Sequence, residues 1–349
     1  MNDSSFCLVL SGGGALGSYE AGVWEALQSS SAPAAEPVRW IASSSVGTVN
    51  AALIAGSAPE RRRDTLAEYW LAGSAWQAEP LVLSGSLRHA SNWLNAAQAR
   101  LWGSPRHLRP GGSQSFYDLG PTVDFLKRKV DFGRLNSGDV RLTVATVDIE
   151  SGDPVLFDTA RGTHIGIDHL LASCGFFPEF APVEFAGRLL GDGGLAWNAP
   201  VEPVLDELEG EGGTVFVVDL YARDGARPSG IESSLVRKNG LMFGNQTWTR
   251  LDLYRRLWQR HGIAGPQILY LSYLPNDDEA GPEASFDFSR ASGRDRWQAG
   301  MLDAAAALAR LDSAHSQGDI LTAIRRHNLQ ERSRPARAQD SVSLKQPAS

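Results

Sequence analysis

The chain has 349 residues, of which 42% are hydrophobic and 21% charged, the balance of an ordinary globular protein. Its formal net charge of −7 argues against general nucleic-acid binding and gives no overall attraction to anionic membranes. The two cysteines, Cys7 and Cys174, are too few for a disulfide framework. The first residues do not resemble a signal peptide, and no apolar run is long enough to span a bilayer. We therefore expect a cytoplasmic protein with reduced thiols.

Short apolar runs alternate with helical patterns through the first 220 residues. The runs expected to be strands are 6–10, 39–45, 140–147, 154–157, two pieces within 183–190, and 213–221. The helical patterns are 16–28, 46–55, 59–72, 119–130, 165–174 and 201–208. This alternation predicts an α/β fold, a three-layer α/β/α sandwich with a mostly parallel central sheet.

Two segments stand apart from this alternation. Residues 74–115 are rich in Trp, Gly, Ser and Pro, and we expect an insertion whose one helical stripe packs on the core, with a lid as the alternative. An amphipathic helix, a strand and a last helix are expected over 231–260, 267–273 and 289–311, which makes 225–312 a C-terminal extension. The main domain is then 1–312, and 313–349 should hold a terminal helix and a polar, disordered tail.

The first feature with chemical potential is a glycine loop between the first strand and its helix. It runs from Ser11 to Gly17 and contains Gly12, Gly13 and Gly14. Glycines let the backbone turn tightly, and bare N–H groups at a helix N-terminus form a natural anion site. We expect the amides of Gly12, Gly13 and Gly14 to form an oxyanion hole.

The second feature is a serine between the second strand and its helix. Ser45 is followed by Val46 and Gly47, and a serine at a sharp strand-to-helix turn has the geometry of a nucleophile elbow. The spacing to Gly47 selects Ser45 rather than Ser43 or Ser44. Serines at a strand end are, in isolation, more often helix caps.

The third feature is an aspartate held among glycines. Asp192 is followed by Gly193 and Gly194, after the apolar pair Leu189 and Leu190. A carboxylate within reach of a serine hydroxyl can accept its proton as a general base. An isolated Asp-Gly-Gly is usually only a turn, so this feature gains weight from the other two.

A competing interpretation starts from the same glycine loop. Gly12, Gly14 and Gly17 also fit the G-x-G-x-x-G pattern of a dinucleotide-binding oxidoreductase. Such a site needs an acidic residue near the end of the second strand, where this chain has three serines. The loop also lacks the Lys-Ser/Thr pair of a phosphate-binding P-loop. We therefore regard the oxidoreductase as the weaker hypothesis.

The three features in this order resemble the patatin-like phospholipase family over roughly residues 6–220. Further matching segments are 20–26, 50–52 and 198–201, and 286–300 looks like the C-terminal extension of one bacterial branch of the family. The resemblance implies a lipid acyl-ester hydrolase, phospholipase A-like or lysophospholipase-like, with Ser45 as nucleophile and Asp192 as general base. It implies no cofactor and no metal, a lipid or acyl-ester substrate, and transient contact with a membrane surface.

Two positions depart from the family pattern. Ser43 stands where the family usually has Gly, and Leu16 stands where it often has Arg. These departures keep an alternative open, a catalytically weak lipid-binding or scaffold protein on the same fold. The sequence gives no head group, acyl-chain length, positional preference or oligomeric state.

Overall fold

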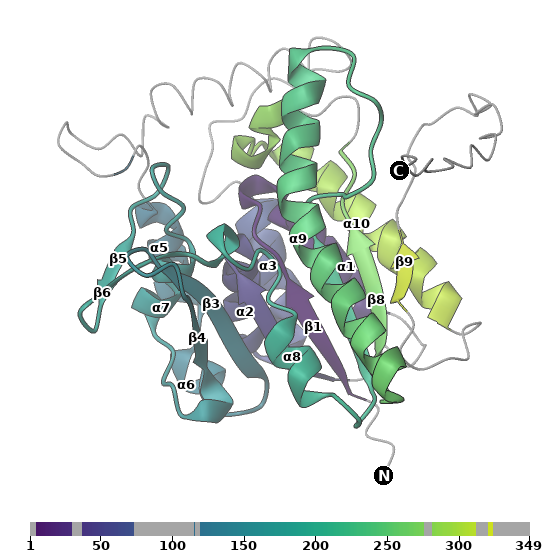
Figure 1. The fold of residues 1–349 in the computed structure, drawn as a ribbon. Helices are drawn as coiled ribbons and strands as arrows, with labels where there is room; N and C mark the ends of the chain where they lie inside the picture. Colours follow the sequence, from purple (N-terminus) through teal and green to yellow (C-terminus); the bar gives the residue numbers. More distant parts are fainter. Residues whose placement is uncertain are drawn as a thin grey trace, which may run out of the picture.

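The computed structural model describes residues 5–29, 37–72, 115, 119–275, 281–311 and 320–323. Within these residues, nine strands form one sheet in the order β5-β6-β3-β2-β1-β7-β8-β9, with β4 paired to β3 (Figure 1). The strands are β1 (Phe6–Leu10), β2 (Val38–Ser44), β3 (Arg141–Asp148), β4 (Pro154–Asp158), β5 (Val183–Phe185), β6 (Arg188–Asp192), β7 (Thr214–Asp219), β8 (Gln267–Ser272) and β9 (Ile320–Ala323).

Helices cover both faces of this sheet. The α-helices are α1 (Ser18–Ser29), α2 (Val46–Ala55), α3 (Arg62–Trp70), α5 (Gly120–Lys129), α6 (Phe132–Leu135), α7 (Ile167–Ser173), α8 (Glu202–Glu207), α9 (Ile231–His261) and α10 (Arg290–Leu311). Short 3-10 turns are η1 (Gly14–Gly17), η3 (Pro59–Arg61), η4 (Thr159–Arg161), η5 (Gly193–Leu195) and η6 (Gly281–Phe286). The helices α8 and α9 lie on one face, and α1, α2, α3 and α10 lie on the other (Figure 1).

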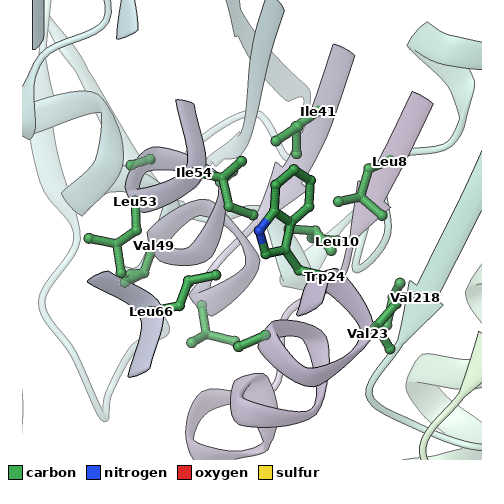
Figure 2. Close-up of a cluster of buried hydrophobic side chains, with 14 of the residues drawn as sticks. Leu8, Leu10, Val23, Trp24, Ile41, Val49, Leu53, Ile54, Leu66 and Val218 are labelled. Carbon is green, nitrogen blue, oxygen red and sulfur yellow. The ribbon is translucent and has the colours of Figure 1, made fainter. Parts of the chain in front are cut away.

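Alternation along the strands divides the core into two layers. In β1, Leu8 and Leu10 face the cluster under α1, α2 and α10, whereas Cys7 and Val9 face the cluster under α8 and α9. Successive side chains of a strand point to opposite faces, so an almost wholly apolar strand is explained by burial on both sides. Figure 2 shows the indole of Trp24 packed among labelled side chains of β1, β2 and α2.

The predicted α/β/α architecture is confirmed, and the sheet is mostly parallel. The strand pairs β1–β2, β1–β7, β2–β3, β7–β8 and β8–β9 are parallel. The pairs β3–β4, β3–β6 and β5–β6 are antiparallel. Because β1 and β2 run in the same direction and Leu10 pairs with Ser43, the turns that follow them emerge at the same edge of the sheet.

The C-terminal half joins the same sheet and core. Strands β8 and β9 continue the sheet beyond β7, and α10 packs closely against α1. Glycines make this helix contact possible, because a Cβ on Gly22 would overlap the carbonyl oxygen of Trp297 and one on Gly300 would overlap that of Tyr19. The segment predicted as an extension therefore shares its core with the first 220 residues.

Several predictions about the remaining segments have different outcomes. Residues 320–323 form strand β9, so the predicted terminal helix of 313–349 is wrong at these positions. The backbone of this short apolar run forms its hydrogen bonds with the neighbouring strand β8. The predicted insertion of 74–115 lies outside the described residues except for Ser115, and so does the predicted disordered tail beyond 323. Among the described residues, no helix is both long and apolar enough to cross a bilayer.

Candidate active site

Ser45 occupies a sharp turn between β2 and α2. Its backbone has φ +54° and ψ −127°, and Ser45 and Ala186 are the two non-glycine residues with positive φ among those described. This conformation costs a residue with a Cβ about 1–2 kcal/mol. Helix α2 starts at once because Gly47 lets it approach the end of β1, where a Cβ would lie 2.6 Å from the Leu10 carbonyl oxygen.

Neighbouring hydroxyl groups hold this turn. The Ser45 amide donates to Ser173 Oγ at 3.0 Å, and Ser173 Oγ donates to the Ala145 carbonyl at 2.8 Å. Ser173 Oγ also contacts Thr48 Oγ1 at 2.9 Å, which in turn contacts Ser43 Oγ at 3.1 Å. The hydroxyl of Ser43, which departs from the family pattern, is thus part of a buried network that supports the turn.

The glycine loop lies directly beside Ser45. A Cβ on Gly12 would lie 2.9 Å from Ser45 Cβ and 2.8 Å from Asn198 Oδ1, so only glycine fits. The Gly12 amide donates to the Asn198 carbonyl at 3.0 Å. The prediction that this amide is open to an oxyanion is therefore wrong for the structure described, because it already has an acceptor. The amides of Gly13 and Gly14 have no acceptor among the described residues.

Asp192 reaches the same edge of the sheet through β6. Ser44 pairs with Ala145 of β3, and the next residue of β3, Thr146, pairs with Asp192 on the other side. Two neighbouring positions of β3 thus bring together residues that are far apart in the sequence. Gly193 follows, and a Cβ there would lie 2.8 Å from Ser44 Oγ, so only glycine lets the chain pass so close.

The carboxyl group of Asp192 is buried, with 1% of the residue exposed. Its Oδ1 accepts a hydrogen bond from the Gly194 amide at 2.7 Å, and its Oδ2 is buried without a hydrogen-bond partner. Burial raises the pKa of Asp192 to about 7. The hydroxyls of Ser45 and Ser44 lie near enough to offset part of this rise, although neither completes a hydrogen bond of good geometry to Oδ2.

A pocket of about 250 Å³ opens over these residues. Gly12, Gly13, Gly14, Ser45 and Asp192 line it together. Most of the other lining side chains are apolar, and several come from α9 and from the segment around η6. The apolar lining residues are Val46, Val49, Tyr69, Leu119, Cys174, Phe176, Phe180, Tyr221, Met242, Phe243, Phe286 and Phe288. Apolar walls around a few polar groups suit a ligand with a hydrocarbon chain.

Cys174 also lines the pocket, but its environment disfavours a thiolate. Burial raises the pKa of the Cys174 thiol well above its ordinary value, and the Asp192 carboxylate adds to the rise. Its Sγ donates to the Ser45 carbonyl at 3.3 Å, which is a contact that supports the turn. Among the described residues, no group of three or more His, Cys, Asp or Glu could hold a metal ion.

The structure adds residues that the sequence did not single out as part of the site. Asn198 accepts from Gly12, and Ser173 accepts from Ser45. The segment 198–201 was noted only as a motif match, which is the signal that could have identified Asn198. The pocket walls supplied by Met242 and Phe243 have no sequence signal, because their position depends on how distant elements pack. Phe286 begins the segment 286–300, whose resemblance to a family extension does not place it in the site.

The dinucleotide hypothesis gains nothing from this geometry. Strand β2 ends at Ser44 and continues into Ser45 and Val46, so β2 itself carries no acidic residue at its end to hold a ribose. The position that would recognise the ribose is instead the turn that carries Ser45.

Known proteins similar to this chain include solved structures and a family defined by sequence. One solved structure, VipD from Legionella pneumophila, is 12% identical with a TM-score of 0.38, covering 86% of this chain and 67% of that one. Another is the complex of full-length SpcU with full-length ExoU from the type III secretion system of Pseudomonas aeruginosa. It is 16% identical with a TM-score of 0.32, and the match covers 68% of this chain and 47% of that one. No curated protein matches. The family model described as patatin-like phospholipase matches residues 8–205, more than half of the chain, and the chain belongs to this family.

Proposed function

We propose that the protein is a serine acyl-ester hydrolase acting on lipids, with a Ser45–Asp192 dyad. The observation that carries this proposal is the meeting of Ser45, Asp192 and the glycine loop in one mostly apolar pocket. Membership of a phospholipase family supports lipid hydrolysis in general. The pKa of about 7 suits Asp192 to the role of a general base near neutral pH.

The proposed reaction has two halves. Ser45 Oγ attacks the ester carbonyl carbon while its proton passes to Asp192 Oδ2, and the amides of Gly13 and Gly14 hold the oxyanion that forms. The intermediate then breaks the bond to the alcohol, which leaves with the proton from Asp192. In the second half, a water gives its proton to Asp192 and attacks the acyl-enzyme. The fatty acid leaves, and Ser45 recovers its proton.

The proposed setting follows from the substrate. A lipid or acyl ester would be drawn from a membrane surface during transient contact, and the protein would otherwise reside in the cytoplasm. The second candidate function is a lipid-binding or scaffold protein with a weak dyad. The observation that favours it is that Asp192 Oδ2 is buried without a hydrogen-bond partner, so Ser45 is not hydrogen-bonded to its proposed base.

A single experiment separates these functions. Wild type, Ser45→Ala and Asp192→Ala are treated with a fluorophosphonate probe and assayed on a soluble ester and on phospholipid vesicles. Ser151→Ala, in an exposed turn, is the matched control. We expect labelling and turnover in wild type and the control, and loss of both in the two site variants. A folded wild type with neither labelling nor turnover would support the binding protein, and tight binding of a dinucleotide would support the oxidoreductase.

A further inference from the structure

A fully buried arginine of α10 reaches the glycine loop from the other end of the chain. Arg296 is 0% exposed, and its Nη1 donates to the Ala15 carbonyl at 2.9 Å and to the Asp287 carbonyl at 2.7 Å. Its Nη2 donates to the Ala284 carbonyl at 3.1 Å. The carboxylate of Asp287, 3.8 Å from Nη2, compensates the charge.

The three carbonyls belong to two separate segments of the pocket wall. Ala15 directly follows Gly13 and Gly14, whose amides have no acceptor. The turn from 284 to 287 carries Ser285, and a Cβ on Gly14 would lie only 2.4 Å from the Ser285 carbonyl oxygen. A planar guanidinium has five donors in a fixed arrangement, so one side chain can set the relative position of both segments.

We propose that Arg296 is a positioning residue that fixes the amides of Gly13 and Gly14 for the oxyanion. The inference rests on the proposed function, because it assigns Arg296 to the geometry of that reaction. It places a determinant of catalysis 91 positions beyond the end of the family match (296 − 205 = 91). The segment after 225 then acts in catalysis as well as in the fold.

The energetic reason is the precision that oxyanion stabilisation requires. Loss of one donor typically lowers kcat about 10²–10³-fold, and a shift of about 1 Å can cost about 10²-fold. Arg296 also bonds the turn that carries the wall residue Phe286, so its loss should raise KM to some extent. A fault in the glycine loop should lower kcat by a larger factor than it raises KM.

The test compares Arg296→Lys and Arg296→Met with a matched buried variant of the same helix. Asp303→Asn is the control, since Asp303 is buried in α10 and accepts from Tyr19 Oη at 2.9 Å, away from the loop. For each full-length protein, Tm, kcat and KM on a soluble ester are measured. Inhibition by a trifluoromethyl ketone, which forms an oxyanion on Ser45, is compared with binding of the product fatty acid.

We expect Arg296→Lys to lower kcat roughly 10²-fold and to weaken the ketone by a similar factor, with much smaller changes in KM and in product binding. The control should keep its kcat even at an equal loss of Tm. The inference about Arg296 would be overturned if Arg296→Lys had the kcat of wild type, or if Arg296→Lys and Asp303→Asn lost kcat by the same factor. Neither result would affect the proposed function. If Arg296→Met does not fold, Arg296→Lys decides. A wild type without Ser45-dependent turnover would overturn the proposed function as well.

Discussion

The hydroxyl of Ser173, at the end of α7, accepts a hydrogen bond from the backbone amide of Ser45 at 3.0 Å. The same hydroxyl donates to the Ala145 carbonyl of β3 at 2.8 Å. The positive φ of Ser45 is therefore supported from outside its own turn, by a helix more than a hundred positions away in the sequence. Strained conformations of this kind persist where the surroundings over-determine them.

Replacing Ser173 should release this support. In Ser173→Ala, the Ser45 amide loses its acceptor inside the protein, and we expect a loss of about 1–3 kcal/mol in the free energy of unfolding. The kcat for ester hydrolysis should fall as well, because the serine is no longer held in place. Denaturant titration and steady-state kinetics measure the two effects. Ser137→Ala is the control, since Ser137 bonds the Arg134 carbonyl on an exposed turn. If Ser173→Ala were as stable as wild type, Ser173 would not support the Ser45 turn.

The supporting network explains why the fold was easier to predict from the sequence than the site. Strands with apolar residues on both faces, such as β1 and β7, are recognisable because their composition is a local property. The link between Ser45 and Asp192 is not local. It depends on β6 running antiparallel beside β3, and a short run such as Arg188–Asp192 gives neither a direction nor a partner. The sequence assigned this pair only through resemblance to a family.

The pocket walls were beyond prediction for a related reason. Met242 lies in a predicted helix, and Phe286 begins the segment 286–300 that resembles a family extension. Neither pattern says that these two residues meet over Ser45. The same holds for Arg296, where a lone arginine in a helical pattern indicates a solvated face far more often than a buried contact. Such contacts follow from tertiary packing alone.

The raised pKa of Asp192 should appear in the pH dependence of activity. A general base must be deprotonated to act, and burial raises the pKa of Asp192 to about 7. Below this pH, kcat/KM should therefore rise about tenfold for each pH unit. Activity on an uncharged soluble ester should then be about 100-fold lower at pH 5 than at pH 9. An aspartate with an ordinary pKa would give a flat profile over this range, and a midpoint below pH 5 would contradict the assignment.

The same pKa shift predicts that Asp192 destabilises the folded protein at neutral and alkaline pH. Between its ordinary value of 3.8 and about 7, the folded state holds a proton that the unfolded state has lost. The free energy of unfolding therefore falls as the pH rises through this window, by at most about 4 kcal/mol at about 1.4 kcal/mol for each pKa unit. Asp192→Asn should remove this loss, because an amide does not ionise and can still accept from the Gly194 amide.

We accordingly expect inactive Asp192→Asn to be more stable than wild type at pH 8 and equal to it near pH 4. Denaturant titrations of both proteins across this range measure the difference. A variant that is less stable than wild type at pH 8 would contradict the prediction. Functional groups that cost stability are common at active sites.

Gly12 provides the sharpest steric test of the site. In Gly12→Ala, the new methyl group would lie 2.9 Å from Ser45 Cβ and 2.8 Å from Asn198 Oδ1, so either the loop or the serine must move. We expect fluorophosphonate labelling to slow by about 10²-fold or more, since a shift of about 1 Å can cost that much. Gly230→Ala is the matched control, because a Cβ there meets nothing within 4 Å and its φ of −163° suits any residue. The control should label at the wild-type rate. Equal rates in Gly12→Ala and wild type would show that the glycine loop is not in contact with the reacting serine.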